Sequence, residues 1–132
     1  MHELVALKNG GNCATNQVLY NLEQRGIEFD LVPWQREHKI PIMAYSPVGH
    51  GRRLLENAAL KKIAERNGAT TAQIALAYLL RQPNMIAIPK ASNPAHVRDN
   101  ARAIDVQLKD VDLQDIDREF PRPKSRQPLG LL

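Results

Sequence analysis

The sequence predicts an α/β fold built on a parallel sheet. Residues 40–48 and 85–88 have the continuous hydrophobicity of strands buried on both faces, and residues 16–20 form a shorter apolar run. Helical segments separate these strands, and such an order forms parallel, right-handed crossovers. Because three strands leave sheet edges and faces uncovered, we expect the segment to be part of a larger sheet or barrel.

Composition indicates a soluble protein with one domain-sized core. The chain has 132 residues, of which 43% are hydrophobic and 24% charged. The net charge is +4, but much of the excess lies at Arg52, Arg53 and the Pro-rich tail 121–128, so we expect no nucleic-acid partner. A single cysteine suits a reducing compartment. With no membrane-length apolar stretch and no secretion signal, the expected location is cytoplasmic.

Two helices are predicted between the second and third strands. The first, within residues 54–68, ends at Gly68, a typical left-handed C-cap. Its expected buried face consists of Leu55, Ala59, Ile63 and Ala64.

The second helix begins at the T-x-x-Q capping box of Thr70 and Gln73 and ends before Pro83. It is apolar nearly all round, which predicts a buried position. A helix-turn-helix is the alternative, but a recognition helix needs polar and basic residues near its N-terminus, and the first basic residue here is Arg81.

Two more helices follow the third strand. Asn93 and Pro94 are a favourable N-cap and first helical residue. Val97, Ala101 and Ile104 recur at helical spacing and predict a buried stripe. Residues 108–120 form the last amphipathic helix, before a basic, proline-containing tail at 121–132.

The stretch after the third strand has the components of an anion site. Lys90 supplies a charge at the carboxyl end of a strand, and Ser92, Asn93 and His96 lie around the start of a helix, whose N–H groups attract phosphate. The alternative is a solvated lysine followed by an ordinary helix cap. Spacing alone leaves both readings open.

Chemistry at the other strands is less marked. Tyr45 and Ser46 end the second strand, where they could form a stacking platform and a phosphate donor, or cap a core. Gln17 in the first strand offers an amide. The sequence shows no H-x-x-x-H spacing, no Gly-rich phosphate loop and no nucleophile with its base, so we predict no catalytic residue and no metal ligand.

Four motifs together resemble the C-terminal half of aldo-keto reductases, and most closely the bacterial branch that reduces small aldehydes and dicarbonyls. They are "NQVLYNL", "PIMAYSPVGHG", "TTAQIALAYLLRQ" and "IPKASNPAHVRDNARAID", and the resemblance extends from about residue 12 to residue 123. The family folds as a (β/α)₈ TIM barrel that binds NADPH at the carboxyl ends of its strands. The resemblance implies that residues 1–120 are part of this barrel, with its strands six to eight.

The resemblance assigns the stretch after the third strand to the 2′-phosphate of NADPH. It places Lys90 against that phosphate, with Ser92 and Asn93 as neighbouring donors. His96 stands where many members have a phosphate-binding arginine, which weakens the expected preference for NADP.

The rest of the cofactor is assigned in the same way. Asn100, and more weakly Asp99, occupy positions that contact the adenine. Tyr45 corresponds to the aromatic residue that stacks on the nicotinamide, Ser46 to a pyrophosphate contact and Gln17 to the partner of the carboxamide.

The family's catalytic Asp, Tyr, Lys and His come from the first half of the barrel, which the resemblance does not include. A complete barrel needs about 250 residues. We therefore expect part of an NADPH-dependent reductase of small carbonyl compounds, with a partial cofactor site, weak NADPH binding and no activity of its own. The alternative is a non-catalytic half-barrel that forms homo-oligomers through its open sheet edges.

Overall fold

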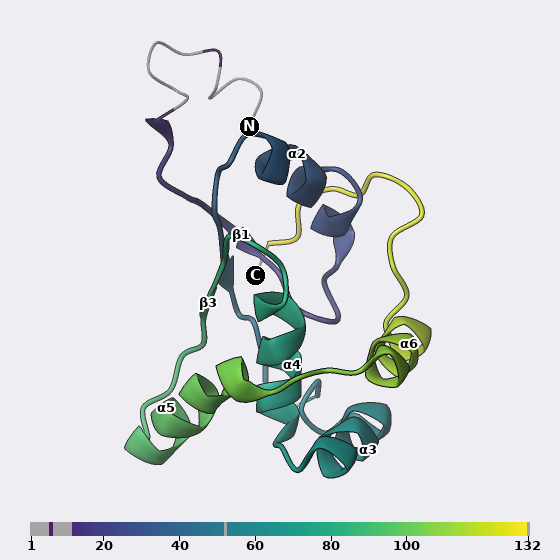
Figure 1. The fold of residues 1–132 in the computed structure, drawn as a ribbon. Coiled ribbons are helices and arrows are strands. Elements are labelled where there is room, and N and C mark those ends of the chain that lie inside the picture. Colours follow the sequence, from purple (N-terminus) through teal and green to yellow (C-terminus); the bar gives the residue numbers. More distant parts are fainter. Residues whose placement is uncertain (1–5, 7–11, 52, 132) are drawn as a thin grey trace.

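A three-stranded parallel sheet forms the centre of the structure, a computed structural model that describes residues 6, 12–51 and 53–131 (Figure 1). The strands are β1 (Asn16–Leu19), β2 (Ile42–Tyr45) and β3 (Met85–Ile88), in that spatial order. Leu19 pairs with Tyr45, and Tyr45 with Ile88, so the three carboxyl ends lie at one edge. The α/β fold and the parallel sheet predicted from the sequence are confirmed.

Helices cover one face of this sheet. They are η2 (Gly26–Glu28), α2 (Leu31–Glu37), α3 (Ala58–Asn67), α4 (Thr71–Leu80), α5 (Pro94–Ala101), η3 (Arg102–Asp105) and α6 (Asp110–Glu119). The buried helix α4 contacts β3 as well as α3, and α6 packs on α3 (Figure 1). Within the described ranges, no helix combines the length and the apolar character needed to cross a membrane.

Local capping signals fix the ends of the helices around α4. The side chain of Thr70 accepts the N–H of Gln73 at 3.2 Å, and Gln73 accepts the N–H of Thr70 at 2.9 Å, which is the predicted capping box. Gly68 ends α3 at φ +59°, where a side chain would be strained. The start of α3 was predicted too early: Asn57 caps it by accepting the N–H groups of its second and third residues.

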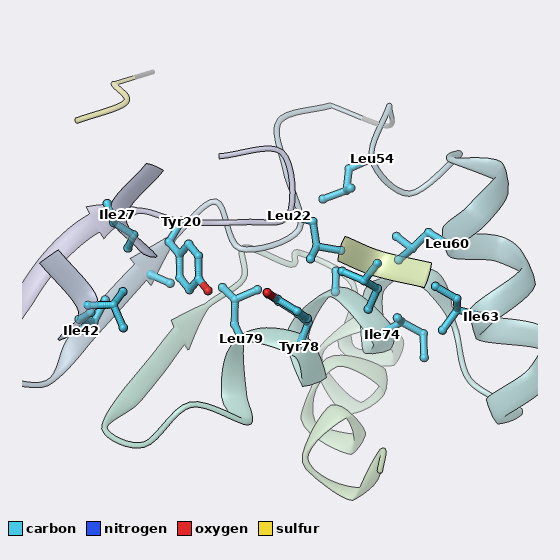
Figure 2. Packing of buried hydrophobic residues seen from close by; sticks show 14 of the residues in the cluster. Tyr20, Leu22, Ile27, Ile42, Leu54, Leu60, Ile63, Ile74, Tyr78 and Leu79 are labelled. Atoms are coloured by element: carbon cyan, nitrogen blue, oxygen red, sulfur yellow. The ribbon is translucent and has the colours of Figure 1, made fainter. Parts of the chain in front are cut away.

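The core lies between the sheet and α4. Val18, Ile42 and Ala44 point to this side of the sheet, and each is at most 6% exposed. Figure 2 shows the hydroxyl ends of Tyr20 and Tyr78 pointing toward each other within this apolar cluster. Both tyrosines are fully buried, so each hydroxyl requires a polar partner.

Two predictions of burial were wrong, and both concern one side of the molecule. The third strand was predicted to be buried on both faces, but Ile86 and Ile88 are 42% and 38% exposed. In the predicted buried stripe of α5 and η3, Val97 is 53% and Ile104 is 72% exposed. The reason is topological: β3 is the edge strand of the described sheet, so nothing in the described chain covers these apolar residues.

The second strand also departs from the prediction of burial on both faces. It is shorter than predicted, and its exposure alternates: Ile42 and Ala44 are buried, whereas Met43 and Tyr45 are half-buried. The half-buried side chains belong to a face, called here the open face, that carries Gln17, Leu19, Met43, Tyr45, Ile86 and Ile88.

Two partly buried ionic clusters connect α6 to the rest of the protein. Arg25, with its side chain 3% exposed, pairs with Glu28 at 2.8 Å and with Asp117 of α6 at 2.9 Å. Arg66 of α3 pairs with the fully buried carboxylate of Asp112. The ion pairs of both clusters hold α6 in one position against the rest of the protein. The apolar face of this ten-residue helix alone would specify that position less well.

The tail after residue 120 folds back along the first strand and its loop. Arg126 pairs with Asp30 at 3.1 Å, and Gln127 lies against Gly26 so closely that an added Cβ would be 2.9 Å from its Oε1. An added Cβ on Gly130 would lie 3.0 Å from Leu19. The tail therefore covers the carboxyl end of β1 on the open face.

Candidate functional site

The carboxyl edge of the sheet brings together the segments that follow β2 and β3. Ser46 comes directly after β2, and Lys90 comes after β3 with only Pro89 between them. Because β2 and β3 are parallel, with Tyr45 opposite Ile88, both segments leave the sheet at the same level. Ligands of α/β proteins collect at this edge.

The first turn of α5 lies immediately beyond Lys90. The side chain of Asn93 accepts the N–H of Ala95 at 2.8 Å, and Pro94 occupies the first helical position. A capped N-terminus still presents N–H groups and the positive end of the helix dipole. Lys90, Ser92 and Asn93 are all exposed on this side of the molecule.

The side chains of Lys90 and Ser92 have no partner in the described part of the chain. Among residues 6, 12–51 and 53–131, no ion pair or hydrogen bond engages the ammonium of Lys90, the hydroxyl of Ser92 or the exposed imidazole of His96. These groups can therefore bind an anion without breaking an existing contact. A cation, a hydroxyl and a helix N-terminus are a suitable donor set for a phosphate.

The two predicted adenine residues differ in their surroundings. The carboxylate of Asp99 accepts hydrogen bonds from Thr70 at 3.1 Å and from Gln73 at 2.9 Å, so it joins α5 to the start of α4. Asn100 is half-buried and lines a groove of about 470 Å³ beside Ile86 and Val97. Asn100 thus borders open space, whereas Asp99 already has partners within the protein.

The open face carries the other two predicted groups. Gln17 lies opposite Met43, one pleat before the pair of Leu19 and Tyr45, so Gln17 and Tyr45 are diagonal neighbours on one face. Gln17 is exposed and Tyr45 is half-buried. This face therefore carries an amide, which can donate and accept hydrogen bonds, close to an aromatic ring, which can stack on a planar group.

Sequence reasoning missed Asn21, the residue that fixes the end of β2. Asn21 is 3% exposed, and its Nδ2 donates to the carbonyl of Ser46 at 3.0 Å. Ser46 itself has φ +48°, which is rare for a residue other than glycine. A polar residue directly after a buried strand was the available signal, but its partner is distant in the sequence.

The structure thus forms two groups from the nine predicted residues. Lys90, Ser92, Asn93 and His96 surround the start of α5, and Gln17, Tyr45 and Ser46 lie on or beside the open face. Asn100 borders the groove next to α5, and Asp99 is directed to α4. Contact of any of them with a cofactor remains a prediction.

This arrangement of parallel strands, crossover helices and polar groups at the carboxyl edge is that of part of a (β/α)₈ barrel. The sequence model of the Aldo/keto reductase family matches residues 2–119. The chain belongs to this family, as the resemblance implied.

Individual relatives agree with this assignment. Methylglyoxal reductase YeaE of Escherichia coli is 42% identical over all of this chain, which covers 48% of that protein. The crystal structure of an aldo-keto reductase from Klebsiella pneumoniae in complex with NADPH is 41% identical with a TM-score of 0.94, over 99% of this chain and 48% of that chain. A second Klebsiella pneumoniae structure, in complex with NADP and acetate, is 40% identical with a TM-score of 0.95. The chain spans about half the length of these relatives.

Proposed function

We propose that the polar residues at the carboxyl edge of the sheet and at the start of α5 form one wall of the NADP(H) site of a carbonyl-reducing aldo-keto reductase. In this proposal Lys90, Ser92 and Asn93 bind the 2′-phosphate, and the nicotinamide lies on Tyr45. The observation that carries it is the position of Lys90 at the carboxyl end of β3, directly before the N-terminus of α5. There Lys90 is a cation without a partner among the described residues.

The charges around α5 support a phosphate ligand. The carboxylate nearest to Lys90 along α5 is that of Asp99, and it is held by Thr70 and Gln73. It therefore does not neutralise the positive end of the α5 dipole and does not pair with Lys90. Arg98 of the same helix is exposed and adds positive charge close by.

The proposed division of labour assigns binding and orientation to this chain. Bound NADPH would supply a hydride to a carbonyl carbon. Gln17 and Tyr45 would orient the ring that carries this hydride, and Ser46 would donate to a pyrophosphate oxygen. The name of the 42% identical relative suggests small dicarbonyl compounds such as methylglyoxal as substrates of the complete barrel. We propose that the 132 residues alone lack the proton donor that the reduction needs.

Calorimetric titration with two ligands tests the proposal. We expect 2′-phospho-ADP-ribose to bind weakly, because only part of a site is present, yet more tightly than ADP-ribose, which lacks the 2′-phosphate. The difference should shrink at high salt, since charge–charge attraction is screened. Equal affinities for the two ligands would contradict the phosphate assignment and leave Asn93 as a helix cap only.

A second candidate function is self-association, and the exposed edge strand favours it. Ile86, Ile88, Val97 and Ile104 form an apolar surface along β3, α5 and η3. The unpaired edge of β3 can accept a strand from another molecule. In this case two copies of the chain would cover each other's apolar surfaces, without a requirement for NADPH.

A further inference from the structure

The backbone at Ser46 is held in a conformation that its own residue type disfavours. Ser46 has φ +48°, and it precedes Pro47, whose ring further restricts the preceding residue. A residue in such a position persists only where neighbouring groups determine it, and such positions cluster at functional sites. Neighbouring groups must therefore hold Ser46 in this left-handed conformation.

The hydrogen bonds of its carbonyl identify two holding groups. The N–H of Gly49 donates to the Ser46 carbonyl at 3.0 Å and closes a tight turn over Pro47. Nδ2 of Asn21 donates to the same carbonyl at 3.0 Å. The first bond is local, whereas the second comes from the loop after β1, so Asn21 ties the turn to the neighbouring segment of the sheet.

Asn21 is itself fixed on its other side. Its Oδ1 accepts the N–H groups of Glu23 and Gln24, both at 3.0 Å. Because an amide oxygen accepts and an amide nitrogen donates, these contacts allow only one orientation of the side chain. Asn21 is 3% exposed, so solvent has little access to its side chain, and its Nδ2 is directed at Ser46.

We propose that Asn21 is a positioning residue of the cofactor site. By holding the Ser46 carbonyl, it keeps Ser46 in the left-handed conformation and thereby sets the direction of the Ser46 hydroxyl and of the Tyr45 ring before it. The ligand portion concerned is the pyrophosphate and nicotinamide half of a dinucleotide, not the 2′-phosphate end at Lys90. This inference rests on the proposed function for the identity of the ligand.

Two substitutions separate this role from an ordinary structural one. Asn21→Asp keeps an oxygen for the N–H groups of Glu23 and Gln24 but directs a carboxylate at the Ser46 carbonyl. Asn21→Ala removes both functions. If Asn21 only stabilised its own turn through Oδ1, the conformation of Ser46 in Asn21→Asp would be the same as in the wild type. We expect both substitutions to remove the hydrogen bond to the Ser46 carbonyl, so that Ser46 leaves the left-handed conformation.

The matched control is Asn16→Ala. Asn16 is the first residue of β1, and its side-chain amide donates to the fully buried Gln35 at 3.1 Å. It stands at the opposite, amino end of the strand, so its removal deletes a similar bond without touching Ser46.

The first readout needs no ligand. In NMR spectra, the cross-relaxation between the amide and Cα protons of one residue is strong only at positive φ. We expect this signal at Ser46 in the wild type and in Asn16→Ala, and its loss in Asn21→Asp and Asn21→Ala. A strong Ser46 signal that persists in Asn21→Asp would overturn the proposal.

The second readout is a comparison of two ligands by titration. We expect both Asn21 variants to weaken NADPH binding by about ten-fold, because a displaced donor loses its contact. The binding of adenosine 2′-monophosphate, which lacks both the pyrophosphate and the nicotinamide, should stay within about two-fold. Equal weakening of both ligands would indicate a general structural effect and contradict the proposal. A wild type without affinity for either ligand would refute the proposed function instead, and the NMR result would still decide the role of Asn21.

Discussion

The phenol of Tyr20 donates a hydrogen bond to Oε1 of Glu28 at 2.8 Å inside the core. Tyr78 donates to the same oxygen at 3.2 Å, and Arg25 donates to both oxygens of the carboxylate, at 2.9 and 2.8 Å. Burial, followed by the nearby Glu28 carboxylate, raises the pKa of Tyr20 above its usual 10.0. Both tyrosines therefore stay neutral donors, and the carboxylate joins β1, η2 and α4.

We predict that Tyr20→Phe lowers the free energy of unfolding by about 1.5–3 kcal/mol, because a hydrogen bond to a buried charged group is lost. Urea denaturation followed by circular dichroism measures this. Tyr45→Phe is the matched control: Tyr45 is half-buried, its hydroxyl has no bond within the described ranges, and its loss should change stability by less than about 0.5 kcal/mol. Equal losses in the two variants would refute the assigned role of Glu28.

A second prediction concerns stability in acid. Burial alone raises the pKa of Asp112, but the N–H of Lys109 at 2.9 Å and the guanidinium of Arg66 outweigh it and hold the pKa below its usual 3.8. A carboxyl group with a lowered folded-state pKa stabilises the fold above its unfolded pKa, and this contribution is lost as the pH falls through the folded-state value. We therefore expect stability to decline as the pH drops below 3.8.

Urea titrations at several pH values measure that decline. Asp112→Asn should lower stability at neutral pH by about 1–3 kcal/mol and flatten the acid limb. The half-exposed Arg66 limits the size of this effect, since solvent screens its charge. An unchanged acid limb in this variant would show that another carboxylate causes the decline.

Local signals let the sequence predict much of the fold. The Thr70–Gln73 capping box, the C-cap at Gly68 and the N-cap at Asn93 each depend on neighbours within a few residues, and the structure contains all three. The start of α3 was misplaced because Leu55 matches helical spacing by chance, whereas Asn57 determines the first turn.

The features that the sequence did not predict depend on contacts between groups distant in the sequence. Periodicity shows that Val97 and Ile104 are apolar, but it cannot show whether a covering surface is present, and here they are exposed. The ion pair of Arg25 could not be predicted from neighbouring residues, because its partner Asp117 lies on α6. For the same reason, no sequence pattern predicted the left-handed backbone conformation of Ser46 or its contact with Asn21.

A third prediction concerns association. The apolar surface of Ile86, Ile88, Val97 and Ile104 should make the chain oligomeric at micromolar concentration. Val97→Lys and Ile104→Lys should increase the monomer fraction in light scattering, because a charged side chain opposes burial at an interface. Leu131→Lys, which changes a residue 86% exposed in the tail, should not. A wild type that is monomeric with a cooperative thermal transition would contradict the prediction.

A fourth prediction concerns catalysis. Tyr20 and Tyr78 are buried, and burial raises the pKa of each, so neither suits proton donation to a carbonyl. Tyr45 lies on the open face, where the proposal assigns it to stacking. We expect the 132-residue chain to show no methylglyoxal-dependent oxidation of NADPH, with methylglyoxal reductase YeaE as the positive control. Robust turnover would contradict the prediction, because it would require a proton donor other than these three tyrosines.

The most direct test of the cofactor wall is the effect of Lys90→Ala on the binding of 2′-phospho-ADP-ribose, measured by calorimetry. A charge-assisted contact to phosphate contributes about 1.5–3 kcal/mol, so affinity should fall roughly ten-fold or more. ADP-ribose binding should hardly change, and Lys61→Ala, which removes an exposed lysine from α3, should affect neither ligand. If Lys90→Ala leaves the affinity for 2′-phospho-ADP-ribose unchanged, Lys90 is a solvated loop residue and the proposed phosphate site is wrong.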